Sequence, residues 1–264
     1  MTDERLSFAD PWPAVRLGAG LGVPVAIGGE LTPGALLGAH RRAIFCQPRC
    51  DEPAIARDEA TYRPDVHAGD ITVLPASGSP YAILWWSPAV RYVIPVAALH
   101  LNRSLRRTIR DHDWSTTLDT DFDGVIAGCR AGREPRWITD QLVAVLRALK
   151  DAGWVHTVEV WSGGDELIGG LFGCVVGGVF IMESAFHRAS DAAKVAIADL
   201  ARRAAGGGIT LLDTEVKSDY TVQMGAIPMP RDDYRAHLAS TDGPGTVQAG
   251  RRRARDLLAA ESPA

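Results

Sequence analysis

A glycine-punctuated apolar run at residues 163–182, GGDELIGGLFGCVVGGVFIM, constrains the fold more than any other part of the chain. Its glycine pairs separate short apolar segments, which predicts three β-segments joined as an antiparallel meander with bulges. The run then meets a carboxylate, Glu183, in the sequence VFIMESAFHR. An ionised carboxylate in apolar surroundings is costly unless a cation pairs with it. We therefore expect Glu183 to face either a basic residue of the chain or a cationic ligand.

The segments around this run predict two helices and two further strands. HTVEVW (156–161) alternates polar and apolar residues, as a half-buried strand does. Residues 139–153 predict an amphipathic helix with Thr139 as its cap, and residues 190–208 predict a helix that ends at three glycines. ITLLDTEV (209–216) predicts a returning strand. The order strand–strand–strand–helix–strand is typical of an acetyltransferase-like core, one option among several α+β folds.

The N-terminal third has a different organisation. The sequence GGELTPGALLGAHRRAIF (28–45) predicts a helix with Thr32 as cap and Pro33 at its first position. Residues 46–80 are rich in Pro, Asp, Ala and Gly without periodicity, which predicts a long loop or insertion. YAILWW (81–86) predicts a strand that ends at Ser-Pro.

These patterns divide the chain into three parts. We expect a small N-terminal domain over 1–88 with an inserted loop at about 46–80. The main domain extends over 89–240, and residues 241–264, rich in Gly, Pro, Arg and Ala, predict a flexible tail.

Composition narrows the cellular setting and the chemistry. The four cysteines include only a lone C-x3-C, whereas a structural zinc site usually shows two ligand pairs, so we expect free thiols and no metal. A net charge of -4 argues against nucleic-acid binding by the whole surface, but it is compatible with a local basic stripe. The first residues lack a secretory signal, and no apolar run approaches the roughly 20 residues of a membrane helix. The expected location is the cytoplasm, with no membrane contact.

Ten segments in register carry a resemblance to a known family, from about residue 26 to 238. The chain resembles the leucyl/phenylalanyl-tRNA–protein transferases, which move an aminoacyl group from a charged tRNA onto a protein N-terminus. The segments are GGELTPGALLGAHRRAIF, ILWWSP, LHLNRSLRR, RWIT, HTVEVW, GGLFG, VFIMESAFHR, DAAK, LLDTE and MGAIPMPRDDY. The resemblance implies an acetyltransferase-like (GNAT-like) mixed sheet flanked by helices, preceded by a small N-terminal domain. It also implies aminoacyl-tRNA as a substrate, no cofactor and a monomer. The acceptor is a protein N-terminus or a small peptide or metabolite.

The resemblance assigns binding roles, and some positions depart from the family. Trp137 is one wall of a slot for the terminal adenine of tRNA, whereas the other wall, a tryptophan, is replaced at Cys46-Gln47. His40 replaces a tyrosine, and of the adjacent Trp85 and Trp86 one belongs in the core while the other, assigned as Trp85, meets a base. Counterparts of five residues surround the aminoacyl side chain, with Leu200 and Ala204 in place of phenylalanines. They are Leu171, Phe180, Leu200, Ala204 and Leu212. For all of these apolar and aromatic residues, an ordinary core position is the alternative.

Four arginines follow one another at helical spacing. Arg103, Arg106, Arg107 and Arg110 lie at i, i+3, i+4 and i+7, so a helix places them on one face. Their mutual repulsion is tolerable if phosphates bind there, which together with the resemblance favours contact with the tRNA backbone. A solvated face balanced by acids elsewhere is the alternative. The RRRAR sequence near the C-terminus could add to this surface.

Three carboxylates are the candidate catalytic groups. The resemblance places Glu183 at the α-amino group of the aminoacyl moiety. Asp213 and Glu215 lie at i and i+2, so on a strand they share a face and one pKa rises, which suits a proton acceptor. The alternatives are an ion pair for Glu183 and two exposed acids at a strand end.

Three functions follow from these observations. The first is aminoacyl-tRNA-dependent transfer to an α-amine, by direct aminolysis and without a nucleophilic residue. The second is an acyl-CoA N-acetyltransferase, although RASDAAK lacks the glycine-rich turn that would bind a pyrophosphate. The third is a non-catalytic binder of charged tRNA or of protein N-termini.

Overall fold

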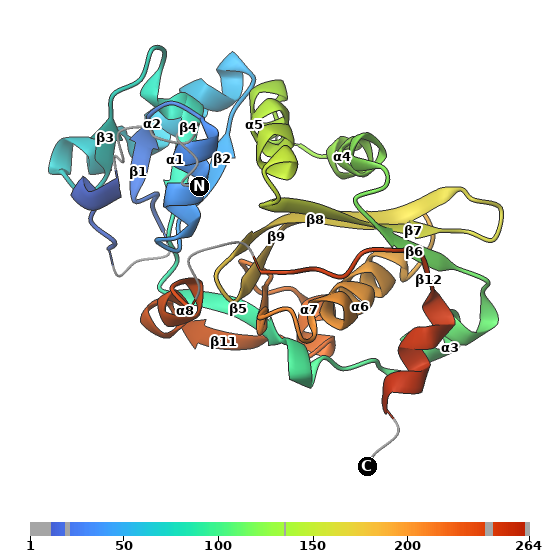
Figure 1. Ribbon diagram of the computed structural model, residues 1–264. Helices are drawn as coiled ribbons and strands as arrows, with labels where there is room; N and C mark the ends of the chain where they lie inside the picture. Colours follow the sequence, from blue (N-terminus) through green and yellow to red (C-terminus); the bar gives the residue numbers. More distant parts are fainter. Residues whose placement is uncertain (1–11, 19–21, 135, 241–244, 262–264) are drawn as a thin grey trace. The chain divides into compact units, whose positions relative to one another are not determined.

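The computed structural model describes residues 12–18, 22–134, 136–240 and 245–261 (Figure 1). The chain divides into two compact units, which are described separately. The first comprises Met1–Val90, Gly132–Ala152 and Pro230–Arg235, and the second comprises Arg91–Ala131, Gly153–Met229 and Ala236–Ala264. Both contain helices and a sheet, so the predicted α+β class is confirmed. Within the described ranges, no helix combines the length and apolar character needed to cross a membrane.

The first unit is built on a four-stranded sheet in the order β2-β4-β1-β3. Strand β1 pairs parallel to β3 and antiparallel to β4. The strands are β1 (Ala26–Gly28), β2 (Phe45–Pro48), β3 (Thr72–Leu74) and β4 (Ile83–Trp86), and the helices are η2 (Trp12–Ala14), α1 (Pro33–His40), α2 (Glu52–Ala68), η3 (Pro80–Ala82) and α5 (Asp140–Asp151). The predicted caps are confirmed, because Thr32 accepts from the Ala35 N–H and Thr139 from the Leu142 N–H.

The predicted loop over 46–80 is wrong for most of its length. Helix α2 fills its centre, capped by the Asp51 side chain at the start and ended by Gly69 in the left-handed conformation. Of its residues only Ala54 is buried. Its other core contacts come from the partly buried side chains of Ile55, Tyr62 and Val66. These apolar residues are few and widely spaced among polar ones, so the helical periodicity in the sequence is weak.

The second unit is built on an eight-stranded mixed sheet in the order β11-β5-β10-β9-β8-β7-β6-β12. Strands β7, β8 and β9 form an antiparallel meander, and β10 pairs parallel to β9. The strands are β5 (Val90–Pro95), β6 (Ser115–Leu118), β7 (Val155–Trp161), β8 (Leu167–Val176), β9 (Val179–His187), β10 (Leu211–Asp213), β11 (Ile227–Pro230) and β12 (Arg252–Arg253). The helices of this unit are η4 (Val96–Ala98), α3 (Arg103–Asp111), α4 (Phe122–Arg130), α6 (Ala192–Ala204), α7 (Asp219–Gln223) and η5 (Ala254–Glu261), and α8 (Arg231–Leu238) crosses the boundary between the units.

Helices α4 and α6 cover opposite faces of the meander (Figure 1). Strand β8 is therefore buried along its whole length. The predicted bulge is present, at Phe172–Gly173, but the expected break at Gly169-Gly170 is not. A Cβ at Gly169 would lie 2.6 Å from the Cβ of Ala192 in α6. This glycine admits a close approach of helix to strand and does not make a turn.

The predicted flexible tail is wrong for residues 245–261. Strand β12 pairs antiparallel to β6, and Val247, Ala254 and Leu257 are buried in the core of the second unit. The apolar residues in this segment are few and separated by arginines, so the sequence alone does not reveal their burial. Residues 241–244 and 262–264 lie outside the described residues.

Candidate active site

A fully buried ion pair organises the end of β10. Asp213 is the last residue of that strand and lies in register with Val93 of β5 and Ile181 of β9. Arg91 donates from Nη2 to Asp213 Oδ2 at 2.6 Å and from Nε to the same oxygen at 3.1 Å. Neither side chain is exposed. Sequence analysis missed Arg91, although a single arginine within the apolar strand sequence VRYVIP was an available signal.

The chain turns sharply after Asp213. Glu215 has a φ of 59°, in the left-handed region, and its N–H donates to Asp213 Oδ1 at 2.7 Å. Asp213 and Glu215 therefore do not share a strand face, because the strand has already ended. This corrects the expected i, i+2 arrangement. A side chain other than glycine or asparagine is costly in this conformation, and such strain is often found at functional sites.

The Glu215 carboxyl group lies in an unusual environment. Its Oε1 is shielded from solvent and accepts no hydrogen bond from any described residue. Burial raises the pKa of Glu215 well above its usual value, the Glu183 and Asp213 carboxylates raise it further, and Arg91 opposes them. The direction agrees with the predicted rise, but burial and Glu183 contribute more than Asp213. The structure thus brings the three predicted catalytic carboxylates within electrostatic reach of one another.

The buried carboxylate of Glu159 provides a comparison for the environment of Glu215. Glu159, in β7, accepts hydrogen bonds from the hydroxyls of Thr117 and Thr157 and from the N–H groups of Thr120 and Asp121. Such a set of donors stabilises a buried carboxylate as part of the fold. Glu215 has one oxygen without a donor, and we therefore regard it as the more reactive of the two.

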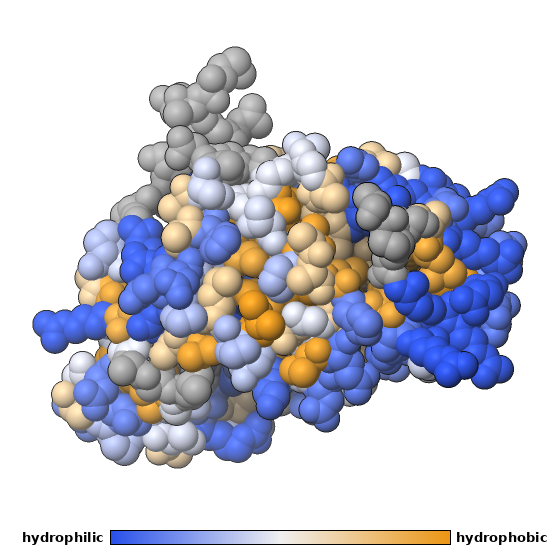
Figure 2. Space-filling view, turned by 90° about the horizontal axis from the view of Figure 1, so that it is seen from below, coloured by the Kyte–Doolittle hydropathy of each residue, from blue (hydrophilic) through white to orange (hydrophobic). Residues whose placement is uncertain are grey.

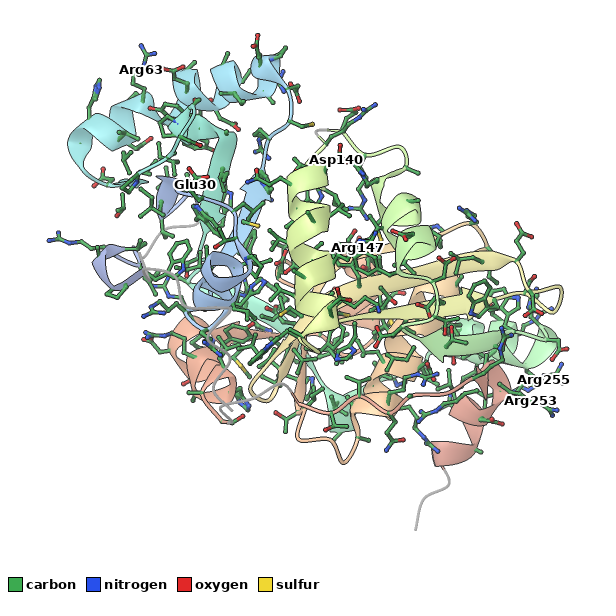
Figure 3. All side chains as sticks on the ribbon, turned by 45° about the horizontal axis from the view of Figure 1, so that its top comes forward. Glu30, Arg63, Asp140, Arg147, Arg253 and Arg255 are labelled. Carbon is green, nitrogen blue, oxygen red and sulfur yellow. The ribbon has the colours of Figure 1, made fainter. Side chains whose placement is uncertain are left out.

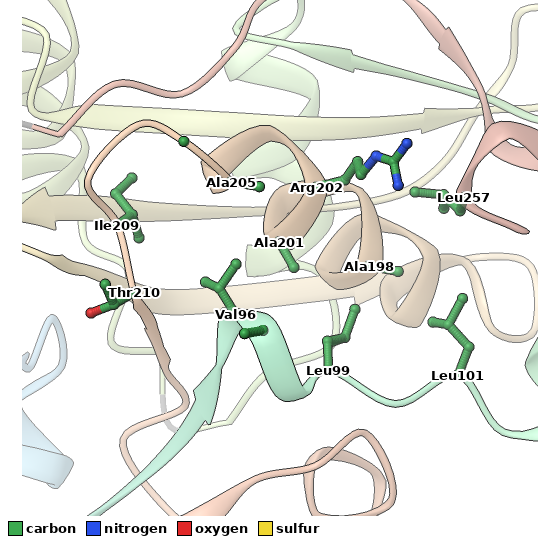
Figure 4. A pocket seen from close by; sticks show the side chains of 12 residues that line it. Val96, Leu99, Leu101, Ala198, Ala201, Arg202, Ala205, Ile209, Thr210 and Leu257 are labelled. Carbon is green, nitrogen blue, oxygen red and sulfur yellow. The ribbon is translucent and has the colours of Figure 1, made fainter. Parts of the chain in front are cut away.

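The five predicted aminoacyl-binding residues are Leu171, Phe180, Leu200, Ala204 and Leu212, and all are fully buried in one hydrophobic cluster. Their binding role stays a prediction, and in this conformation they pack as core. A hollow of about 470 Å³ lies beside α6, on a face of the helix other than the one that carries Leu200 and Ala204 (Figure 4). Ala198 and Ala201 line it from α6 and Ala205 from the C-cap of that helix, and Val96 and Leu99 line it from the segment at η4.

The predicted adenine-binding residues belong to the first unit. His40 and Trp85 are fully buried, and Trp85 Nε1 donates to the Gly28 carbonyl at 2.8 Å. Of the adjacent tryptophans, Trp85 is thus the core member, whereas Trp86 is half-buried and packs edge-on against Tyr62. Trp137 is also half-buried. The contact of Trp137 with a base stays a prediction. His40 and Trp85 occupy core positions in this structure, which was the alternative to a role in adenine binding.

The predicted arginine helix is confirmed as α3. Its buried residues are Leu105 and Ile109, so the arginines are displaced toward solvent. Arg106 is half-buried and its Nε donates to the Leu101 carbonyl, and Arg107 pairs with Asp111 at 3.3 Å. The other two members, Arg103 and Arg110, are exposed and form no ion pair with any described residue. They are the arginines of the stripe that are free to bind an anion.

No described residues assemble a metal site. Within the part of the chain that the structure describes, no disulfide joins Cys46, Cys50, Cys129 or Cys174. Among the described ranges, no three His, Cys, Asp or Glu side chains are grouped as metal ligands would be.

Comparison with known proteins identifies the family. Residues 93–239, more than half of the chain, match the family described as leucyl/phenylalanyl-tRNA protein transferase. The chain belongs to this transferase family. The matched region contains Glu183, Asp213 and Glu215, and begins two residues after Arg91.

Individual relatives extend this match over most of the chain. The leucyl/phenylalanyl-tRNA–protein transferase of Tolumonas auensis is 35% identical over 240 residues, covering 90% of this chain and 88% of that protein. That of Aromatoleum aromaticum is 37% identical, covering 84% of this chain and 83% of that protein. That of Paracoccus denitrificans is 40% identical, covering 66% and 81%. The resemblance predicted from ten sequence segments is confirmed.

Proposed function

We propose that this protein is an aminoacyltransferase that joins the amino acid of an aminoacyl-tRNA to an acceptor α-amine, namely a protein N-terminus. Membership in the transferase family supports the reaction class. The observation that carries the chemistry is the Glu215 carboxyl group, with one buried oxygen that accepts no hydrogen bond from a described residue and a raised pKa. A carboxylate of this kind is a stronger base than an exposed one.

The chemistry then requires positioning and removal of one proton. The aminoacyl ester is already activated, so the amine nitrogen attacks its carbonyl carbon directly and no enzyme nucleophile takes part. A free α-amine has a pKa of about 7.7–8.0, and it must be neutral to attack. The new C–N bond replaces the ester C–O bond. Glu215 accepts the proton lost by the amine and passes it to the ribose oxygen that leaves, so the carboxylate is regenerated.

Two neighbours prepare Glu215 for this role. Asp213 accepts from the Glu215 N–H and is itself held by Arg91, so the ion pair fixes the turn that presents the carboxyl group. Glu183 raises the pKa of Glu215 when both are charged. We place Glu183 opposite the α-amino group of the bound aminoacyl moiety, because the ligand's positive charge would relieve this repulsion.

We extend the proposal to the architecture and setting. The mixed sheet with α4 and α6 on its faces is compatible with a GNAT-like core in the second unit. The first unit would be the small N-terminal domain, and it includes Gly132–Ala152 and Pro230–Arg235 in addition to the predicted residues 1–88. Aminolysis of an ester calls for no cofactor. The acceptor could be a small peptide or metabolite as well as a protein, and we propose a cytoplasmic monomer, since charged tRNA is found in that compartment.

A transfer assay tests this function. The purified protein is incubated with a panel of radiolabelled aminoacyl-tRNAs and an acceptor peptide with a free α-amine, without coenzyme A. Label should appear in the peptide, and a peptide with an acetylated N-terminus should remain unlabelled. Label that appears only from an acyl-CoA would favour the acetyltransferase alternative. Saturable binding of charged tRNA with no transfer from any of them would favour the binder.

The exposed arginines of α3 give a separate prediction. Charge reversal of Arg103 and Arg110 should weaken binding of aminoacyl-tRNA and lower the slope of log affinity against log salt by about 2, because each phosphate contact contributes about 1. Filter binding at several salt concentrations measures the slope. Reversal of Arg57 and Arg63, which are exposed on α2, changes the net charge equally and serves as the control. Equal slopes for both variants would contradict a specific role of α3.

A further inference from the structure

A second group of arginines lies near the C-terminus, in the sequence RRRAR (251–255). Arg251 pairs with Asp165 at 2.7 Å. Arg253 and Arg255 are exposed, and neither forms an ion pair with a residue in the described ranges. Figure 3 shows both side chains extending outward beside the C-terminal 3-10 helix. Two adjacent guanidinium groups are thus available to a ligand.

The backbone that carries these arginines is fixed. Arg252 and Arg253 pair with Thr116 and Ser115 of β6. The fully buried Arg203 of α6 donates to the Gln248 carbonyl at 2.7 Å and pairs with Asp199. Because the segment is anchored in the fold, its arginines lose less conformational freedom on binding than those of a flexible tail.

The same segment borders a hollow with excess positive charge. Its volume is about 310 Å³, and its charged lining consists of Arg202, Arg252 and Arg253 with Asp199 and Asp256. The adjacent Arg203 already pairs with Asp199. Burial and the positive charges of Arg203 and Arg202 lower the pKa of Arg252, against the opposing effect of Asp199. An anion of phosphate size would relieve this repulsion.

The position of the segment suggests which anion binds. Helix η5 packs against α3 and α6, so the segment that carries the RRRAR arginines lies next to the helix that carries the α3 stripe. Figure 2 shows hydrophilic residues gathered at the end of the second unit where α3 and η5 lie. A polyanion can reach both groups, whereas a single small anion cannot. RNA is such a polyanion, with a phosphate at every nucleotide.

We propose that Arg202, Arg253 and Arg255 form a second phosphate-binding surface for the tRNA, continuous with the arginines of α3. This inference rests on the proposed function and adds a contact site to it. Within the described ranges, none of its members is one of the carboxylates of the candidate active site or forms a hydrogen bond with one, so we assign the surface to binding. It therefore affects the concentration of tRNA needed for transfer and leaves the rate at saturation unchanged.

The test is a double charge reversal, Arg253→Glu with Arg255→Glu. The salt slope for aminoacyl-tRNA binding should fall by about 2, and the KM for tRNA should rise at least tenfold at low salt while kcat is unchanged. A neutral variant, Arg253→Gln with Arg255→Gln, should show a smaller rise in KM. An unchanged thermal unfolding temperature verifies that β12 remains paired.

The comparison variants separate the ways in which the idea can fail. Suppose that charge reversal of Arg253 and Arg255 leaves both the salt slope and the KM for tRNA at the parent's values, whereas charge reversal of Arg103 and Arg110 lowers the salt slope. The second surface then does not exist, and the proposed function stands. If the reversal lowers kcat but not binding, the surface is not a binding site. If the parent transfers no amino acid from any tRNA, the proposed function itself fails. Binding to phosphatidylserine vesicles that the reversal abolishes, with tRNA binding intact, would assign the surface to a membrane instead.

Discussion

Replacement of Arg91 by methionine should lower the free energy of unfolding by about 3–5 kcal/mol, because it leaves the buried Asp213 carboxylate without its cation. Neither side chain of this pair is exposed, so solvent cannot screen the remaining charge. Urea denaturation at neutral pH, followed by circular dichroism, measures the change. The Glu215 turn should loosen as well, since Asp213 accepts from its N–H.

Two further variants define the cause of this loss. The double variant Arg91→Met with Asp213→Asn removes both charges and should recover part of the lost stability. The exposed pair Arg63–Glu59 on α2 provides a matched control, and Arg63→Met should leave the free energy of unfolding nearly unchanged, because solvent screens an exposed pair. If Arg91→Met costs no more than Arg63→Met, the ion pair does not stabilise the second unit.

Replacement of Glu215 by glutamine should change the pH dependence of both stability and transfer. Between its unfolded pKa, about 4.3, and its raised folded pKa, Glu215 binds more proton in the folded protein than in the unfolded one. Stability should therefore fall as pH rises through this window. Glutamine removes the titration, so the variant should match the parent near pH 4 and exceed it at neutral pH, by about 1.4 kcal/mol for each unit of the shift.

The same substitution should alter the rate profile. The acid limb of kcat, which reflects deprotonation of Glu215, should move to lower pH, and the maximal rate should fall without vanishing, since solvent can still accept the proton. Rates of transfer measured across a pH series test this. Glu166→Gln, at an exposed position in the β7–β8 hairpin, is the control and should leave both profiles unchanged. A Glu215→Gln variant with the parent's rate profile would show that this carboxyl group does not act as the base.

The parts of the fold that could be predicted from the sequence are those in which a local pattern, such as a capping residue, coincides with apolar residues that the fold buries. Helices α1 and α5 start at Thr32 and Thr139 as expected, because a capping side chain and an apolar stripe coincide there. Helix α2 was missed because it fully buries only Ala54 and its other core contacts, from Ile55, Tyr62 and Val66, are partial and widely spaced in the sequence. Gly169 was interpreted as a break, but its role is a close approach to Ala192, which no local pattern records.

The candidate site was predictable in its members but not in its geometry. Glu183, Asp213 and Glu215 are identified by sequence, and the structure brings them together. The turn that follows Asp213 depends on a positive φ at Glu215. A residue other than glycine seldom adopts this conformation, so it could not be predicted from the sequence. Arg91 lies 122 residues before Asp213, so only the fold reveals their pairing.

The pairing of β12 with β6 has a consequence for synthesis of the chain. Strand β6 lies between β7 and β12, and the residues that cover its outer edge, Arg252 and Arg253, are translated long after β6 itself. Until they emerge from the ribosome, β6 offers unpaired N–H and C=O groups, and such an edge invites pairing with other nascent chains. A protein shortened before residue 252 would keep that edge open permanently and would be prone to aggregate.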